Sequence, residues 1–119
     1  TRYDLSSHTR AVHAAAPCPV EVKREMIGWW GPILMEYYAG SEGNGMTLID
    51  SAQWLEHPGS VGRAIYGTVH ICDLDTGAEL PPAETGLVYW EAPLPFEYHN
   101  DPAKTRDVTH PEGWTTLGD

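Results

Sequence analysis

The chain has 119 residues, of which 41% are hydrophobic and 20% charged, a composition typical of a folded globular protein and not of a disordered one. Its formal net charge is −10, from 17 acidic and 7 basic residues, so it lacks the basic surface that binding to nucleic acid or to an anionic membrane requires. An anionic ligand such as ATP would need backbone N–H groups, a metal ion or residues outside this chain to hold it.

The two cysteines, Cys18 and Cys72, lack the spacing of a disulfide framework, and we interpret them as reduced, buried thiols of a cytoplasmic protein. No apolar run is long enough for a transmembrane segment, and no signal peptide is visible. The first residue is Thr1 and not Met, so we expect the natural N-terminus to lie upstream.

The first elements expected are a short strand over residues 10–16, with the sequence AVHAAA, and a helix over residues 20–30. Pro19 suits the start of that helix, and Gly31-Pro32 is expected to end it. Four side chains are predicted to share its apolar face, at i, i+4, i+7 and i+8: Val22, Met26, Trp29 and Trp30.

The apolar run PILMEYY, residues 32–38, is short and lacks clean alternation, which is typical of a buried parallel strand in a strand–helix–strand unit. A glycine-rich loop, AGSEGNG, follows over residues 39–45. We therefore assign residues 1–58 to an α/β segment.

Residues 59–119 have a different pattern. Short β-type runs, GTVHICDLD and TGLVYWEA, are separated by turn residues and predict an antiparallel, barrel-like segment. A helical turn is expected over residues 101–105, with Asp101 as its cap and Pro102 at its first position. The final GWTTLGD is strand-like. The predicted fold class is α+β, a partial α/β segment followed by a small distorted antiparallel β-barrel.

The loop YYAGSEG carries groups suited to a nucleotide, because it follows a buried strand at the end where α/β sheets bind ligands. Tyr38 offers a flat face for stacking, Ser41 a hydroxyl for a phosphate oxygen, and Glu42 a carboxylate of the kind Mg²⁺ accepts. The alternative for this loop alone is an ordinary connection that caps a strand.

Two further segments strengthen the nucleotide interpretation. The small-residue strand end AAAPCP, residues 14–19, would let a planar base lie against the backbone. Asp119, at the end of GWTTLGD, could form a bidentate hydrogen bond with ribose hydroxyls. Three loops of this kind at strand ends make a plausible nucleotide pocket.

Five ordered motifs resemble the adenylate-forming superfamily of acyl-CoA synthetases, luciferases and peptide-synthetase adenylation domains. YDLSS with HAAAPCP resembles the adenosine-loop region, and YYAGSEG resembles the family's Tyr-Gly-x-Thr-Glu motif. GSVGRA is similar to Gly-x-x-Gly-Lys/Arg, and GLVYW with YHNDPAKT resembles the next core motif. GWTTLGD resembles Gly-Trp-x-x-Thr-Gly-Asp. The tract PCPVEVKREMIGWWGP particularly resembles bacterial fatty-acid or related acyl-CoA synthetases.

The resemblance implies a role for each matching residue. Ser41 would contact the α-phosphate and acyl carboxylate, and Glu42 would be the residue associated with Mg²⁺, so both are candidate catalytic residues. Tyr38 would stack on adenine, and Asp119 would bind ribose. The other positions implied to line the nucleotide site are Ala15, Ala16, Pro17, Tyr37 and Ala39.

Some positions depart from the family pattern. Ser41 stands where threonine is usual, and Ala14 and Ala39 stand where glycine is common. Leu87 replaces a glutamate, and Leu117 occupies the threonine position before Gly-Asp. We interpret these differences as drift within an acyl-CoA ligase branch.

The activity implied by the resemblance is ATP-dependent and AMP-forming. A small-molecule carboxylate would react with ATP to give an acyl-adenylate, and the thiol of coenzyme A would then displace AMP. The resemblance places this chain inside the large N-terminal domain, with a phosphate loop expected upstream and a lysine-bearing domain downstream. We therefore expect the chain alone to be inactive, and to self-associate or to pack on missing parts of its own enzyme.

Other interpretations stay open at this point. The second acceptor could be a carrier-protein thiol, as in a peptide-synthetase adenylation domain. The chain could also be a non-catalytic acidic interaction module. His70 with Cys72, and His13 with Cys18, could contribute to a metal site, against the alternative of ordinary packing.

Overall fold

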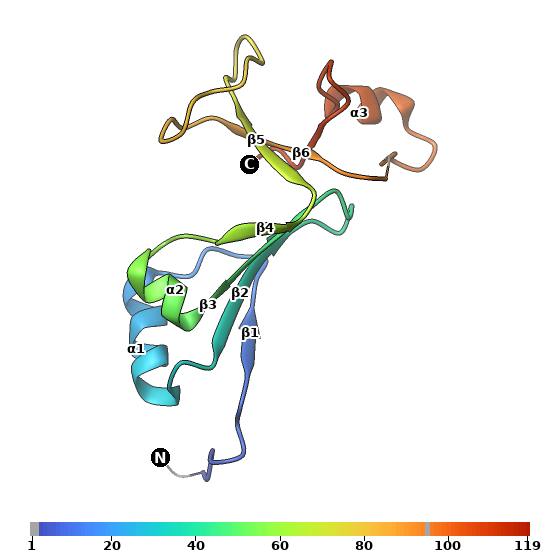
Figure 1. Cartoon of the computed structure of the whole chain (residues 1–119). Helices are drawn as coiled ribbons and strands as arrows, with labels where there is room; N and C mark the ends of the chain where they lie inside the picture. Colours follow the sequence, from blue (N-terminus) through green and yellow to red (C-terminus); the bar gives the residue numbers. More distant parts are fainter. Residues whose placement is uncertain (1–2, 95) are drawn as a thin grey trace. The chain divides into compact units, whose positions relative to one another are not determined.

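The computed structural model describes residues 3–94 and 96–119, and these residues divide into two compact units (Figure 1). The N-terminal unit comprises the chain up to Tyr38 together with Thr47–Arg63. The C-terminal unit comprises Ala39–Met46 together with Ala64–Asp119. The fold is α+β, as predicted. The sequence-based division into segments 1–58 and 59–119 stays a prediction.

A four-stranded sheet has the strand order β1-β2-β3-β4. Strands β1 and β2 are parallel and are joined through helix α1, which forms the predicted strand–helix–strand unit. The elements of this half of the chain are β1 Ala11–His13, α1 Val20–Trp30, β2 Leu34–Ala39, β3 Met46–Asp50, α2 Ser51–Glu56 and β4 Arg63–Tyr66.

Helix α1 has the predicted bounds, and its end has a clear local cause. Gly31 adopts φ +86°, a left-handed conformation, and its N–H donates a hydrogen bond to the Ile27 carbonyl at 2.8 Å. Strand β1 is shorter than the predicted 10–16. Ala15, at φ +74°, leaves the extended conformation and so interrupts the run of small residues.

The predicted apolar face of α1 is confirmed at Met26 and Trp30 and is wrong at Val22 and Trp29. Val22 and Trp29 are exposed, at 50% and 56%, whereas Lys23 and Ile27 are buried. Ile27 belongs to a core cluster with Leu34, Ile49 and Trp54, against which Met26 and Trp30 pack in part. The predicted face did not include Lys23, because a pattern of apolar residues cannot show that a carboxylate on β2 pairs with a lysine.

Strand β3 and helix α2 were not predicted, although α2 carries a recognisable start signal. The Asp50 side chain accepts a hydrogen bond from the Gln53 backbone N–H at 2.8 Å, and the Gln53 side chain accepts one from the Asp50 N–H at 3.4 Å. This is a capping box with aspartate at the N-cap. Ser51 then donates its hydroxyl to the Leu34 carbonyl at 2.7 Å, which ties α2 to β2.

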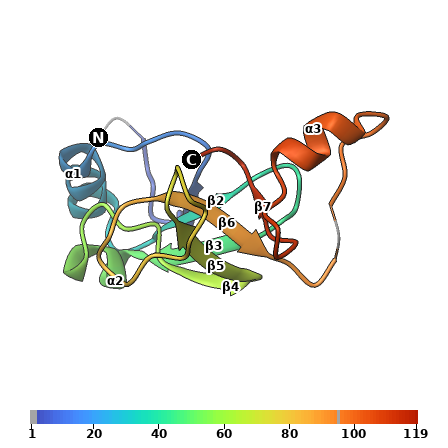
Figure 2. The same ribbon diagram turned by 90° about the horizontal axis from the view of Figure 1, so that it is seen from above.

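The C-terminal unit contains an antiparallel sheet of order β5-β6-β7, with α3 set off from its strands (Figure 2). The antiparallel pairing is as predicted, while closure into a barrel stays a prediction. Asp101 caps α3 by accepting a hydrogen bond from the Lys104 N–H at 2.9 Å, and Pro102 occupies the first turn, both as predicted. The bounds are β5 Thr68–Cys72, β6 Leu87–Glu91, α3 Pro102–Asp107 and β7 Thr115–Thr116.

The core of this unit is centred on Trp90 and Cys72, which are 1% and 0% exposed. Cys72 is therefore buried as predicted, but Cys18 is only half-buried, because it lies in the loop between β1 and α1. Within the described ranges, 3–94 and 96–119, no helix has the length and hydrophobicity needed to cross a membrane.

Candidate nucleotide site

The N-terminal unit brings two of the sequence-predicted segments to one edge of its sheet. In the parallel pair β1 and β2, His13 lies opposite Glu36. The loop after β1 and the last residues of β2 therefore lie at the same end of the sheet, the end at which α/β folds bind ligands. Those after β1 are Ala15, Ala16 and Pro17, and those at the end of β2 are Tyr37 and Tyr38.

These residues differ in exposure in a way that suits a binding surface. Ala15, Ala16 and Pro17 are exposed, whereas Tyr37 and Tyr38 are half-buried. Ala15 holds a left-handed conformation without being glycine, which costs on the order of 1 kcal/mol and persists only where the surroundings impose it. The loop after β1 thus has a defined backbone path and small, exposed side chains at residues 15–17.

The C-terminal unit contains the other predicted residues and brings its own set together. Ser41 and Asp119 are exposed, and Glu42 is half-buried. A Cβ on Gly40 would lie 2.7 Å from both the Glu42 carboxylate and the Leu117 side chain, so this loop lies directly against the segment that ends at Asp119. The Val88 N–H donates to the Asp119 carbonyl at 3.0 Å, which attaches that segment to β6.

Buried contacts hold the loop that carries Ser41 and Glu42. Asn44, 1% exposed, donates its side-chain amide to Thr115 Oγ1 at 3.3 Å. Gly45 lies so close to the Trp90 ring that a Cβ would come within 2.0 Å of it. Ala39 begins the loop at the last position of β2. The loop's glycines therefore serve close packing as well as the turn itself.

Tyr98 contacts the candidate residue Glu42, and the sequence analysis did not single it out. Its hydroxyl donates a hydrogen bond to Glu42 Oε1 at 3.1 Å. Burial, and then the Glu42 carboxylate, raise the pKa of Tyr98, so the phenol keeps its proton and remains a donor at neutral pH. The only sequence signal was that Tyr98 opens YHNDPAKT, a segment quoted for its family resemblance.

The residues present fit a Mg²⁺ ion that is held mainly by its substrate. Among residues 3–94 and 96–119 no group of three or more His, Cys, Asp or Glu side chains could hold a metal ion. Mg²⁺ commonly uses one or two carboxylates and completes its shell with phosphate oxygens and water. Glu42, oriented by Tyr98, could supply one such carboxylate.

The α+β fold, with its parallel strand pair and the glycine-flanked Ser-Glu loop after β2, is that of the N-terminal domains of adenylate-forming enzymes. The family model described as AMP-binding enzyme matches residues 1–97. The chain belongs to the AMP-binding enzyme family.

Curated relatives match almost the whole chain. A long-chain-fatty-acid–CoA ligase of Bacillus subtilis (strain 168) is 33% identical over 119 residues, which covers 98% of this chain and 21% of the ligase. A luciferin 4-monooxygenase of Photuris pensylvanica is 27% identical over 99% of the chain and 22% of its own length. The chain thus spans about a fifth of the length of these relatives.

Solved structures agree with this assignment. An amide bond synthetase of Marinactinospora thermotolerans matches 99% of this chain and 24% of its own, with a TM-score of 0.85 and 30% identity. ATP-bound MatB of Rhodopseudomonas palustris matches 91% of this chain and 22% of its own, with a TM-score of 0.78 and 29% identity. The ligase, the monooxygenase and the amide bond synthetase are named for different reactions, so these similarities support the family and do not single out one acceptor.

Proposed function

We propose that this chain is part of an ATP-dependent, AMP-forming acyl-CoA synthetase. The carboxylate oxygen of a small organic acid attacks the α-phosphorus of ATP, and pyrophosphate leaves. The thiol of coenzyme A then attacks the acyl carbon, and AMP leaves. The observation that carries the proposal is the 33% identity to a fatty-acid–CoA ligase along 98% of the chain.

In this proposal the two units supply different parts of the chemistry. In the N-terminal unit Tyr38 stacks on adenine, while Tyr37 and the loop of Ala15, Ala16 and Pro17 lie along the nucleoside. In the C-terminal unit Ser41 donates to the phosphate and acyl carboxylate, and Asp119 accepts hydrogen bonds from ribose. Ala39 contributes backbone beside the base.

Glu42 is the proposed Mg²⁺ carboxylate. When bound, Mg²⁺ would offset negative charge on the phosphates, which matters in a chain of net charge −10. The Tyr98 hydroxyl holds Glu42 Oε1 at 3.1 Å and thereby sets the direction in which the second carboxylate oxygen points. Such positioning before the reaction is the main contribution a protein makes to phosphoryl and adenylyl transfer.

The test is Glu42→Ala in the full-length enzyme, measured by ATP–pyrophosphate exchange. We expect exchange to fall by about 100-fold or more, because the metal's charge acts on the reacting phosphates, while AMP affinity measured by calorimetry falls much less. Tyr98→Phe removes one hydrogen bond only and should cost about 5-fold. The matched control is Glu84→Ala, which removes an exposed glutamate of the same unit. Equal exchange in wild type and Glu42→Ala at saturating Mg²⁺ would exclude this role.

A separate measurement identifies the thiol that accepts the acyl group in the second step. Coenzyme A-dependent release of AMP by the full-length enzyme supports an acyl-CoA synthetase. Exchange without any reaction with coenzyme A would point to a carrier-protein thiol, and a complete lack of exchange would favour a non-catalytic module.

The 119 residues alone are proposed to be inactive in the same assay. The proposal also places the enzyme in the cytoplasm, with its two free cysteines as support.

A further inference from the structure

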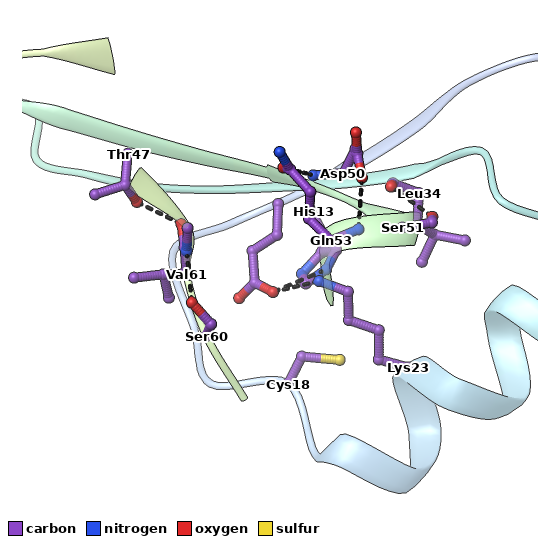
Figure 3. A network of polar contacts seen from close by, with 12 residues as sticks. His13, Cys18, Lys23, Leu34, Thr47, Asp50, Ser51, Gln53, Ser60 and Val61 are labelled. Atoms are coloured by element: carbon purple, nitrogen blue, oxygen red, sulfur yellow. Dashed lines mark hydrogen bonds and ion pairs between the residues drawn. The ribbon is translucent and has the colours of Figure 1, made fainter. Parts of the chain in front are cut away.

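Lys23 is buried, although lysine is almost never fully buried unless it is paired. Its side chain is 1% exposed and extends from α1 toward the strands of the N-terminal unit (Figure 3). There it forms an ion pair with the carboxylate of Glu36 on β2, whose side chain is 12% exposed. Its ammonium also lies 4.9 Å from the centre of the Trp54 ring on α2. One cation therefore connects two helices and a strand.

His13 is the third member of this group. Its Nε2 atom lies 3.6 Å from Glu36 Oε2, within ion-pair reach, and it is buried without a hydrogen-bond partner among the described residues. His13 and Glu36 are also direct neighbours across the parallel pair β1 and β2. We refer to Lys23, Glu36 and His13 as the charged cluster.

Each member of the charged cluster flanks a segment of the proposed nucleotide site. His13 is the last residue of β1, directly before the loop of residues 14–19. Lys23 lies just after that loop, in the first turn of α1, where its backbone N–H donates to the Pro19 carbonyl at 3.1 Å. Glu36 directly precedes Tyr37 and Tyr38. The loop is thus held at both of its ends to the strand that carries the two tyrosines.

We propose that the charged cluster is a positioning device for nucleotide binding, which holds the loop of residues 14–19 in place against the end of β2. This proposal rests on the proposed function, since it assigns a purpose to the same edge of the sheet. The left-handed conformation of Ala15 supports it, because a non-glycine residue keeps such a backbone only when its surroundings impose it. The contact of Lys23 with Glu36 is also a charge-assisted hydrogen bond, which is more sensitive to small shifts than an apolar contact.

We expect the protein to fold without the charged cluster. Replacing a buried ion pair by apolar side chains of similar volume is often neutral or stabilising, whereas removal of one partner leaves an uncompensated charge. A variant without both charges should therefore fold normally and still lose the geometry of the loop. Such a variant therefore separates a positioning role of the charged cluster from a merely structural role.

His13 provides a second test of the charged cluster, through the pH dependence of nucleotide binding. Burial, and then the charge of Lys23, lower the pKa of His13, while Glu36 opposes them, so His13 is neutral at neutral pH. Without Lys23, His13 would gain a proton more readily and could replace the missing cation beside Glu36. The other titratable groups lining the same cavity of about 430 Å³ are His8 and Cys18. Nucleotide binding by Lys23→Met should thus improve as the pH falls.

The experiment uses the full-length enzyme with the variants Lys23→Met, Lys23→Met/Glu36→Leu and Lys23→Met/His13→Asn. The matched control is Ile27→Ala, which removes a buried side chain one turn further along the same helix. For each protein we would measure KM for ATP and kcat in ATP–pyrophosphate exchange, ATP affinity by calorimetry, and Tm, between about pH 6 and pH 8.

We expect Lys23→Met to raise KM for ATP about tenfold or more at pH 8, with a partial recovery at pH 6 that Lys23→Met/His13→Asn lacks. Lys23→Met/Glu36→Leu should keep a Tm close to wild type and still show the raised KM, at every pH. Ile27→Ala should lower Tm and leave KM unchanged.

Two results would overturn the positioning role. The first is a wild-type KM for ATP in Lys23→Met/Glu36→Leu. The second is a raised KM for ATP in Ile27→Ala, since that would show that loss of stability alone raises KM. A wild type that binds ATP but performs no exchange would instead contradict the proposed function, and the calorimetric affinities would then decide the positioning role. A wild type that binds no ATP would overturn both.

Discussion

Gly62, in the GSVGRA segment, lies where no other residue fits. Its φ of +88° is left-handed, and a Cβ there would lie 2.0 Å from the Leu48 carbonyl oxygen. The same segment is attached to β3 by the Thr47 hydroxyl, which donates to the Val61 carbonyl at 2.6 Å, and the Gly62 N–H donates to Ser60 Oγ at 3.0 Å. The glycine is thus required by both backbone conformation and close approach.

Gly62→Ala should therefore destabilise the protein by roughly 2–4 kcal/mol, from the cost of a left-handed alanine together with displacement of β3. Gly113→Ala is the control, because Gly113 has a similar φ of +86° but a Cβ there would meet no atom within 4 Å. It should lose only about 1–2 kcal/mol. Denaturant unfolding followed by tryptophan fluorescence measures both. Equal losses in the two variants would show that close packing at Gly62 contributes nothing.

At the scale of elements, His70 joins the antiparallel strands of the C-terminal unit to the turns beside them. Its ring stacks on Trp114, with centres 3.7 Å apart and planes 2° apart, and Trp114 stacks in turn on His110. Its Nδ1 lies 2.8 Å from Glu79, and its Nε2 lies 3.1 Å from Glu91. Both nitrogens can donate only when the ring is protonated, so the arrangement favours the imidazolium form.

The stability of the C-terminal unit should consequently fall as the pH rises past neutrality. Burial alone would lower the pKa of His70, but the hydrogen bonds and charges of Glu79 and Glu91 outweigh it and raise the pKa. Because the pKa of His70 is raised in the folded state, the contribution of His70 to stability is complete at pH values below its pKa in the unfolded chain, about 6.5. This contribution is lost as the pH rises through the pKa of His70 in the folded state.

Hydrogen exchange of the β5 amides across this pH range measures the effect. His70→Gln should remove this part of the pH dependence, whereas His99→Gln, at an exposed histidine of the same unit, should retain it. Protection of β5 that is independent of pH in the wild type would contradict the role of His70.

At the scale of the whole molecule, the N-terminal unit presents apolar side chains and an open strand edge. Val12 and Trp29 are 57% and 56% exposed, and β1 lies at one end of the strand order. Unpaired strand edges and exposed apolar side chains favour association with another chain or another segment. The chain also spans only about a fifth of the length of its curated relatives.

We therefore expect the 119-residue chain, produced alone, to self-associate. The net charge of −10 opposes this, but its repulsion is screened beyond about 8–10 Å at ordinary salt. Burial of apolar surface at about 25 cal/mol per Å² should exceed the repulsion over a patch of several hundred Å². Sedimentation over a wide concentration range is the test. A sharp 13.2 kDa monomer at high concentration would show that the chain covers its own apolar surface.

Much of the local structure follows from the sequence. Helix α1 has its predicted bounds because Pro19 and Gly31 act on the backbone directly, and α3 follows from the cap Asp101 with Pro102. The order of five motifs was sufficient to identify the family, which the match over residues 1–97 confirms. The candidate site residues stay predictions, although each unit places its own members together.

Tertiary structure decided which polar groups are buried and which residues orient the site. Periodicity within α1 could not reveal that Lys23 is buried, since its partner Glu36 lies 13 residues away on another element. The same holds for Tyr98, which contacts Glu42 across 56 residues. A local sequence pattern predicts which face of one helix or strand is apolar. It contains no information on which charged group or hydrogen-bond donor from a distant part of the chain will contact that face in the folded protein. For that reason the sequence by itself determined α1, the cap of α3, the antiparallel strands and the family, and the fold alone determined the charged cluster and the orientation of the Glu42 carboxylate.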